Sequence, residues 1–442
     1  MSQELLKTAH DIIRMARAAG AEQARAAVYR EQDSSVEWRD GQLDRLQQST
    51  TMGVGMSLYV NGRYSTHGTS DLRPEALEGF IREAVAMTRL LAEDPHRRLP
   101  DPSRYGGQFA GDLQLYDPQG SAAITGIERR RIAQALEEAV RSAPGADKVI
   151  SVEAACGNGV GESAMVNSNG MEGTDRRTSF FWSAGATVRD EGDRKPQGDW
   201  YSFALRRDRM EPVETIGRLA LSRALEGLGE KPRSSGRYPC VLENRIVGRA
   251  LGGLFAALSG SAIQQQRSFL ANRIGETIAS PKLTVVDDPH VVLGLGSCLF
   301  DEEGMTAQRM PVIEQGVLRN YYLDTYYAAK LGLPPTTGGQ TNLVFESGER
   351  DLEGLLQAMG TGVLITGFMG GNSNSTTGDF SIGIRGHWIE SGRRVQPLAE
   401  MNLSGNHLEV WKHLVESGAD VWEKSSVRAP SLRFDELQFS GA

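Results

Sequence analysis

Helix-like and strand-like patterns of apolar residues alternate along the first half of the chain. Between residues 3 and 20 the apolar positions recur at the spacing of an amphipathic helix, and Gly20 ends the pattern. Strand-like runs follow, and residues 74–91 again carry a helical apolar stripe. Residues 128–228 repeat this order of helix, strands and helix. The pattern predicts an α+β fold whose N-terminal α/β half contains a duplicated helix–strands–helix unit.

Two Asn-Gly pairs in this half lie between strand-like runs, as in tight β-hairpins. Asn61-Gly62 and Asn169-Gly170 each separate runs rich in β-branched and aromatic residues. A segment rich in Gly, Lys, Pro and Ser then separates the two halves at residues 227–236. We therefore expect an N-terminal domain over residues 1–230, with possible sub-units 1–95 and 120–230, and a C-terminal domain over residues 236–442.

The second half consists mainly of short strand-like runs between Gly-rich turns, which predicts a largely antiparallel β domain. One long helical pattern interrupts it, with Ile246, Ala250 and Leu254 on one face. Shorter helical patterns cover residues 326–331 and 407–416. The predicted strands are 237–242, 283–286, 291–295, 307–314, 317–322, 362–368, 379–386, 387–390, 395–403 and 432–439.

Composition and charge narrow the classes of protein. The 442 residues carry a formal net charge of −8, which argues against a nucleic-acid binder. The chain lacks an apolar run of the roughly 18 residues that a membrane helix needs, so no membrane partner is expected. Its three cysteines lie far apart, which is typical of a reducing compartment. We expect a cytoplasmic protein.

Two short acidic segments could hold a cation. Asp288 and His290 follow a predicted strand, and with His387 they form the weak metal candidates of the chain. The alternative for the first segment, which the Asp-Pro pair favours, is an ordinary turn at the end of a strand. The acidic run 301–304 could bind a cation or a basic peptide, and its alternative is a solvated loop.

The segment from Phe368 to Phe380 is the most unusual loop of the sequence, because Gly, Asn, Ser and Thr dominate it. Gly and Asn allow backbone amides to turn outward, and such a loop beside a sheet edge could bind an extended peptide. Its alternative is a flexible hairpin. The candidate peptide-contact residues are Gly370, Gly371, Asn372, Ser373, Asn374 and Asp379.

Four segments of the second half carry a resemblance to a known family. They are GETIASPKLTVVDD at 275–288, FDEEG at 300–304, GVLRNY at 316–321 and TGDFSIG at 377–383. With a fainter likeness at Gly53-Val-Gly55 and Ser70-Asp71, they resemble the TldD/PmbA family, once called modulators of DNA gyrase. The resemblance spans most of the chain.

The resemblance also implies what this chain lacks. A TldD-type chain is a zinc peptidase with a His-Glu-x-x-x-His motif on the long helix and a Cys ligand near the C-terminus. The corresponding positions here fall near Leu251 to Ala256, including Gly252, and near Trp422, and none of these residues is a zinc ligand. The chain therefore resembles the PmbA or TldE type, for which the family implies no metal and no catalytic residue.

The same resemblance implies partners. It implies a heterodimer with a TldD-type subunit that holds the zinc, and an activity on unfolded or modified peptides. One alternative is a stand-alone peptide-binding homodimer without peptidase activity. Another is a peptidase with an atypical metal site at Asp288, His290 and His387.

Overall fold

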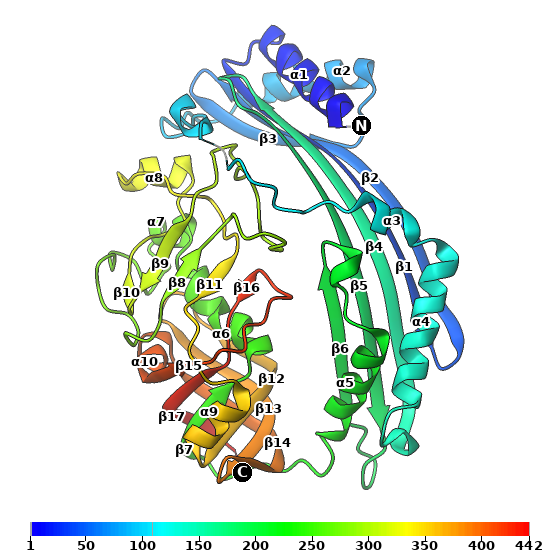
Figure 1. Ribbon diagram of the computed structural model, residues 1–442. Coiled ribbons are helices and arrows are strands. Elements are labelled where there is room, and N and C mark those ends of the chain that lie inside the picture. The colour runs from blue at the N-terminus through cyan, green and yellow to red at the C-terminus, as the bar shows by residue number, and fades with distance from the viewer. Residues whose placement is uncertain (1, 108, 442) are drawn as a thin grey trace.

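The structure is a computed structural model that describes residues 2–107 and 109–441. It confirms the predicted α+β fold, with an α/β N-terminal half and a β-rich C-terminal half that contains a closed barrel. Figure 1 shows the long strands of the N-terminal half as a curved wall beside the C-terminal half. No helix in these two ranges is both long and apolar enough to cross a membrane.

The N-terminal half is built on one antiparallel sheet of six strands in the order β3-β2-β1-β4-β5-β6. Along β5 every second residue from Thr178 to Val188 is buried, so one face of this part of the sheet is covered. The sheet strands are β1 (Gln23–Arg39), β2 (Gln42–Val60), β3 (Arg63–Thr69), β4 (Val149–Asn167), β5 (Glu172–Val188) and β6 (Gln197–Ala204).

The helix–strands–helix order predicted twice is observed twice. In the first unit α1 and α2 flank β1 to β3, and in the second α4 and α5 flank β4 to β6. One apolar core lies under α1 and α2 and another under α4 and α5, and each includes residues of both β1 and β4. Antiparallel pairing of β1 with β4 joins the two units into one sheet. The helices of this half are α1 (Ser2–Ala18), α2 (Pro74–Thr88), α3 (Pro118–Ala123), α4 (Gly126–Arg141) and α5 (Val213–Leu225), with 3₁₀ turns at Pro102–Tyr105, Ala146–Lys148 and Arg207–Arg209.

Both predicted hairpins exist, but they occupy different places in the two units. Asn61-Gly62 joins β2 to β3, whereas Asn169-Gly170 lies between β4 and β5. The turn equivalent to the second one is Asp40-Gly41, with φ values of +46° and +80°. Asp-Gly carries the same hairpin signal as Asn-Gly, so the sequence contained this turn as well.

The C-terminal half contains a barrel and a smaller sheet. In the barrel the strand order is β14-β13-β12-β7-β17, and pairing of β14 with β17 closes it. The five-stranded sheet has the order β10-β9-β8-β11-β16. The strands are β7 (Gly236–Leu242), β8 (Val285–Asp287), β9 (Met310–Glu314), β10 (Val317–Leu318), β11 (Leu343–Phe345), β12 (Gly362–Ser373), β13 (Asp379–Glu390), β14 (Arg393–Asn406), β15 (Leu414–Ser417), β16 (Val427–Arg428) and β17 (Leu432–Ser440).

The predicted long helix of this half is α6, which follows β7 and packs on the barrel strand β12. The larger apolar core of this half includes Leu251, Leu254 and Phe255 of α6, and a smaller cluster lies around α9. The helices are α6 (Asn244–Ala256), α7 (Gly260–Gln264), α8 (Thr325–Leu331), α9 (Leu352–Met359) and α10 (His407–Val410), followed by a 3₁₀ turn at Trp411–His413.

Several local predictions for this half were wrong, among them the strand predicted over 317–322, which covers only Val317–Leu318. Residues 291–295 form turns rather than a strand, and Leu293 has a left-handed φ of +61°. The helix predicted over 407–416 ends at His413, where β15 follows. The strand predicted to end at Phe368 continues to Ser373 because its partner β13 pairs with it throughout. Tertiary pairing decides such short segments more than local composition does.

Candidate functional site

Helix α6 begins directly where β7 leaves the barrel. The first backbone N–H of the helix, at Asn244, donates to Ser431 Oγ (3.0 Å) rather than to a side chain of its own segment. One face of α6 is buried in the core, and the opposite face exposes Arg249, Gly252 and Ala256. The resemblance places the zinc motif on this helix at Leu251, Gly252 and Ala256, and Leu251 belongs to the buried face.

The residues at these positions do not fit a zinc ion. Leu251 is only 1% exposed and packs in the core, whereas Ala256 lies at the surface. Neither these two aliphatic side chains nor Gly252 between them offers an oxygen, nitrogen or sulfur atom that could bind the ion. Within residues 2–107 and 109–441 there is no group of three or more His, Cys, Asp or Glu that could hold a metal ion.

A buried histidine fills the space beside α6. His407 is 3% exposed. The centroid of its ring lies 4.8 Å from that of Phe380 and 5.8 Å from that of Phe269. Trp411 Nε1–H donates to His407 Nδ1 (3.2 Å). Burial lowers the pKa of His407 to about 4, so the ring is uncharged at neutral pH. The ring contacts could not be predicted from the sequence, because Phe269 and Phe380 lie far from His407 along the chain.

The predicted peptide-contact loop is mostly strand. Gly370 to Ser373 belong to β12 and Asp379 begins β13, so the turn covers only residues 374–378. All six candidate residues are exposed. The turn is ordered by hydrogen bonds: Asn374 N–H donates to the Asp379 carbonyl (2.8 Å), and Asn406 Nδ2 donates to Asp379 Oδ1 (2.9 Å).

The last part of β12, which leads into this turn, lies next to α6. A Cβ built on Gly253 of α6 would lie 2.7 Å from Ser373 Oγ. The guanidinium of Arg249, also on α6, donates to the carbonyl of Phe368 (2.8 Å). The Gly-rich segment and the helix with the absent motif therefore form one surface.

Trp422 belongs to a different cluster. The centroid of its ring lies 5.7 Å from that of Trp200 and 6.1 Å from that of Tyr201, and both residues belong to β6 of the N-terminal sheet. The guanidinium of Arg245, in the first turn of α6, lies 5.6 Å from the same ring. Trp422 thus packs at the junction between the two halves, near the start of α6.

The weak metal candidates are not brought together. Asp288 Oδ1 accepts the backbone N–H of His290 (2.9 Å), which is the turn geometry that the Asp-Pro pair favoured. The ring of His290 stacks on Phe109 (4.5 Å). His387 lies in the barrel strand β13 and lines a cavity beside Glu226. The three side chains therefore offer no common site.

The acidic turn at 301–304 is not a fully solvated loop. Asp301 Oδ1 accepts the backbone N–H groups of Glu303 and Met305 (2.9 Å each), which closes the turn. Burial, followed by the charge of Glu303, raises the pKa of Asp301 to about 6. A cavity of about 130 Å³ beside it is also lined by Arg25 and Arg97 of the N-terminal half. Sequence reasoning could not have paired these distant segments.

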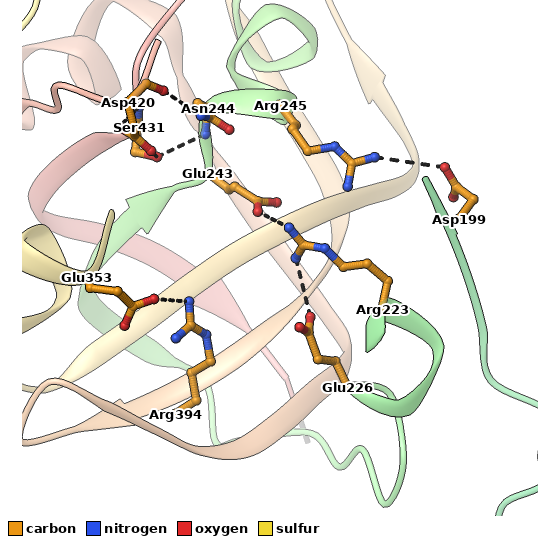
Figure 2. A network of polar contacts seen from close by, with 10 residues as sticks. All are labelled: Asp199, Arg223, Glu226, Glu243, Asn244, Arg245, Glu353, Arg394, Asp420 and Ser431. Carbon is orange, nitrogen blue, oxygen red and sulfur yellow. Dashed lines mark hydrogen bonds and ion pairs between the residues drawn. The ribbon is translucent and has the colours of Figure 1, made fainter. Parts of the chain in front are cut away.

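A polar network at the junction between the halves was also missed. Figure 2 shows Arg223 reaching from α5 to Glu243, the residue before α6, and to Glu226. Arg245 points toward Asp199 of β6, with 3.9 Å between Nη2 and Oδ2. These ions come from three separate elements, and the sequence offered no spacing that would have linked them.

Models of one protein family match three parts of the chain. Models of the PmbA/TldA metallopeptidase domain 1, central domain and C-terminal domain match residues 24–88, 121–228 and 235–441. The metalloprotease PmbA of Escherichia coli O157:H7 is 27% identical over 423 residues, which cover 95% of this chain and 92% of that protein.

Solved structures agree with this comparison. A crystal structure described as a candidate modulator of DNA gyrase from Bacteroides thetaiotaomicron has a TM-score of 0.94 and 41% identity, covering 99% of this chain and 98% of that one. TldE from Thermococcus kodakarensis has the same fold, with a TM-score of 0.85, 22% identity and coverage of 98% and 100%. The chain belongs to the PmbA/TldD metallopeptidase family.

Proposed function

We propose that this chain is the non-catalytic, TldE-type subunit of a two-chain zinc metallopeptidase that acts on unfolded or modified peptides. The observation that carries the proposal is the chemistry of α6. Leu251, Gly252 and Ala256 offer no metal ligand, and Leu251 points into the core. Catalytic zinc needs about three protein ligands and an open position, which these residues cannot supply.

In this arrangement a TldD-type partner supplies the zinc and the general base. This chain supplies the surface formed by α6 and the exposed turn at 374–378, which covers part of the cleft. The turn exposes polar side chains and backbone beside a sheet, which suits an extended peptide. The three free cysteines, Cys156, Cys240 and Cys298, fit a reducing compartment such as the cytoplasm.

An open sheet edge supports a two-chain assembly. β3 pairs only with residues 54–60 of β2, and residues 42–53 pair with no strand on their outer side within the described parts of the chain. This segment is exposed on both faces and carries Leu43 (47% exposed) and Leu46 (64%). Figure 1 shows β2 at the outer margin of the wall. A long open edge with apolar side chains is a surface that a second chain can cover.

The test is reconstitution of the pair. The purified chain alone is expected to contain almost no zinc by elemental analysis and to cleave no unfolded peptide. Mixed with a TldD-type chain, it should form a complex with one zinc per pair that cleaves the peptide. A TldD-type chain whose motif Glu is replaced by Gln is the control, and it should bind but not cleave. The proposal would be refuted if this chain, purified alone, held about one zinc per molecule or cleaved the peptide without the partner.

A stand-alone homodimer is the second candidate, because the open edge of β2 could also pair with a second copy. Analytical ultracentrifugation of the isolated chain distinguishes the homodimer from the heterodimer hypothesis. A stable dimer that does not exchange with a TldD-type chain would favour the homodimer. An atypical peptidase requires His290 and His387 to act together. Loss of an activity of the chain alone in His290→Ala or His387→Ala would favour it.

A further inference from the structure

A cavity of about 250 Å³ lies where the N-terminal sheet meets the barrel. One wall comes from the start of β6 and the end of α5, with Gly198 and Arg223. The opposite wall comes from β12 and β13, with Arg385 and His387, and Arg245 of α6 completes the lining. Because both halves contribute walls, the site exists only in the full chain.

Part of the charge in this cavity is already neutralised. Arg223 is bound by Glu243, which is 4% exposed, and its Nη1 lies 3.3 Å from Glu226 Oε2. Burial opposes the charge of Arg223, but the two carboxylates raise its pKa overall. Glu230 is paired with Arg194 outside the lining (2.7 Å). These groups fix the wall and leave little charge for a ligand.

The other two guanidinium groups of the lining are less fully neutralised, although Asp199 also lines the cavity. Arg245 is held over the ring of Trp200 at 4.1 Å, and its nearest carboxylate is that of Asp199 at 3.9 Å, which is 75% exposed. The buried Nε of Arg245 has no hydrogen-bond partner among the residues that the structure describes. Arg385 is exposed toward the cavity side and forms no ion pair within residues 2–107 and 109–441. A ligand with an anionic group would satisfy both.

His387 supplies a complementary group. It is 6% exposed, and burial, the largest effect, lowers its pKa, so the ring is neutral. Its Nδ1 is buried and has no hydrogen-bond partner among the described residues, while the ring forms a hydrogen bond with the backbone of Glu226. A neutral ring that donates from Nε2 to that backbone carbonyl keeps Nδ1 as an unfilled acceptor. The cavity thus has hydrogen-bond donors and one acceptor without partners. Buried polar groups rarely lack hydrogen-bond partners, so these groups indicate a missing ligand.

We propose that this cavity binds a small molecule with a carboxylate next to an N–H donor, the chemistry shared by a free amino acid and the C-terminal residue of a short peptide. The carboxylate binds the guanidinium groups of Arg245 and Arg385, and the N–H donates to His387 Nδ1. The cavity is smaller than the roughly 300–1,000 Å³ of sites for drug-sized ligands, which suits a ligand of this size. The proposal does not depend on a partner subunit.

The full chain alone is titrated calorimetrically with alanine, alanyl-alanine, alanyl-alanine amide and inorganic phosphate. Alanine or alanyl-alanine should bind, and the amide should bind at least tenfold more weakly because it lacks the carboxylate. Binding should also change tryptophan emission, because Trp200 lies under Arg245. Binding of alanine only assigns the site to free amino acids, and binding of the dipeptide only assigns it to peptide C-termini.

Arg385→Gln tests the location, since this exposed side chain has no ion pair whose loss would impair folding. It should weaken binding at least tenfold. Arg394→Gln removes the same charge from a neighbouring residue that pairs with Glu353 (2.7 Å) outside the lining, and it should leave binding unchanged. The proposal is overturned if no ligand binds, if phosphate or the amide binds as tightly as alanyl-alanine, or if Arg385→Gln binds like the unaltered chain.

Discussion

Gly253 of α6 packs directly against the imidazole of His407. A Cβ built on Gly253 would lie 2.4 Å from His407 Nε2, closer than any real side chain approaches. The imidazole cannot retreat, because it lies between Phe269 and Phe380 and accepts a hydrogen bond from Trp411. The glycine that weakens the helix locally is therefore required by the contact between α6 and the barrel.

The neighbouring glycines of α6 should respond oppositely to alanine. Gly253→Ala forces a methyl group into His407, and such overpacking costs about 1–3 kcal/mol. Gly252 has open space at its Cβ position, so Gly252→Ala should stabilise by up to about 1 kcal/mol through helix propensity. Urea unfolding of both variants measures the difference. Equal effects of the two substitutions would contradict the packing described for Gly253.

His407 should make the chain less stable in mild acid. Its pKa is about 4 when folded and about 6.5 when unfolded, so the unfolded chain binds the extra proton first. The free energy of unfolding is therefore highest above pH 6.5, where His407 is neutral in both states. It falls by on the order of 3 kcal/mol as the pH falls toward 4. Urea midpoints at several pH values between 4 and 7 test this.

His407→Gln is the matched variant for this experiment. It should be less stable near neutral pH but should show a flatter dependence on pH, because the buried ionisable ring is gone. Asp301 acts in the opposite direction, since its raised pKa of about 6 favours the folded state as the pH falls from 6 toward 3.8. An unchanged slope in His407→Gln would show that His407 does not set the acid sensitivity.

The ion pairs of Figure 2 should differ in their energetic weight. Glu243→Gln leaves Arg223 buried with one carboxylate fewer, and breaking a buried pair costs about 3 kcal/mol or more. Glu353→Gln breaks the pair with Arg394, but Glu353 is 62% exposed, so the cost should stay below about 1 kcal/mol. Thermal or urea unfolding measures the loss of unfolding free energy in each variant. Similar losses in Glu243→Gln and Glu353→Gln would show that burial does not strengthen the pair of Glu243 with Arg223.

The open edge of β2 should determine assembly. Leu46→Glu places a charge on the exposed strand and should weaken binding to a TldD-type chain at least tenfold, with little change in the stability of the chain itself, because Leu46 is 64% exposed. Leu90→Glu is the control at a residue that is 85% exposed beyond α2. Analytical ultracentrifugation of the mixtures decides. Normal complex formation by Leu46→Glu would exclude this edge as the interface.

Much of the fold could be predicted because local patterns repeat over long elements. The alternation of buried positions in β5 and the apolar stripe of α6 both follow directly from residue order. The short strands β11 and β16 could not be predicted. Each has three residues or fewer. They exist because β11 pairs with both β8 and β16, which come from distant parts of the chain.

The candidate site divides in the same way. The absence of zinc ligands near Leu251 and Ala256, and the Gly-rich character of the segment beside them, are properties of the sequence alone. Only the tertiary structure places His407 against Gly253, and Arg245 between the barrel and Trp200. These contacts join residues far apart in the chain, and their energy comes from burial and charge pairing that no local pattern of residues records.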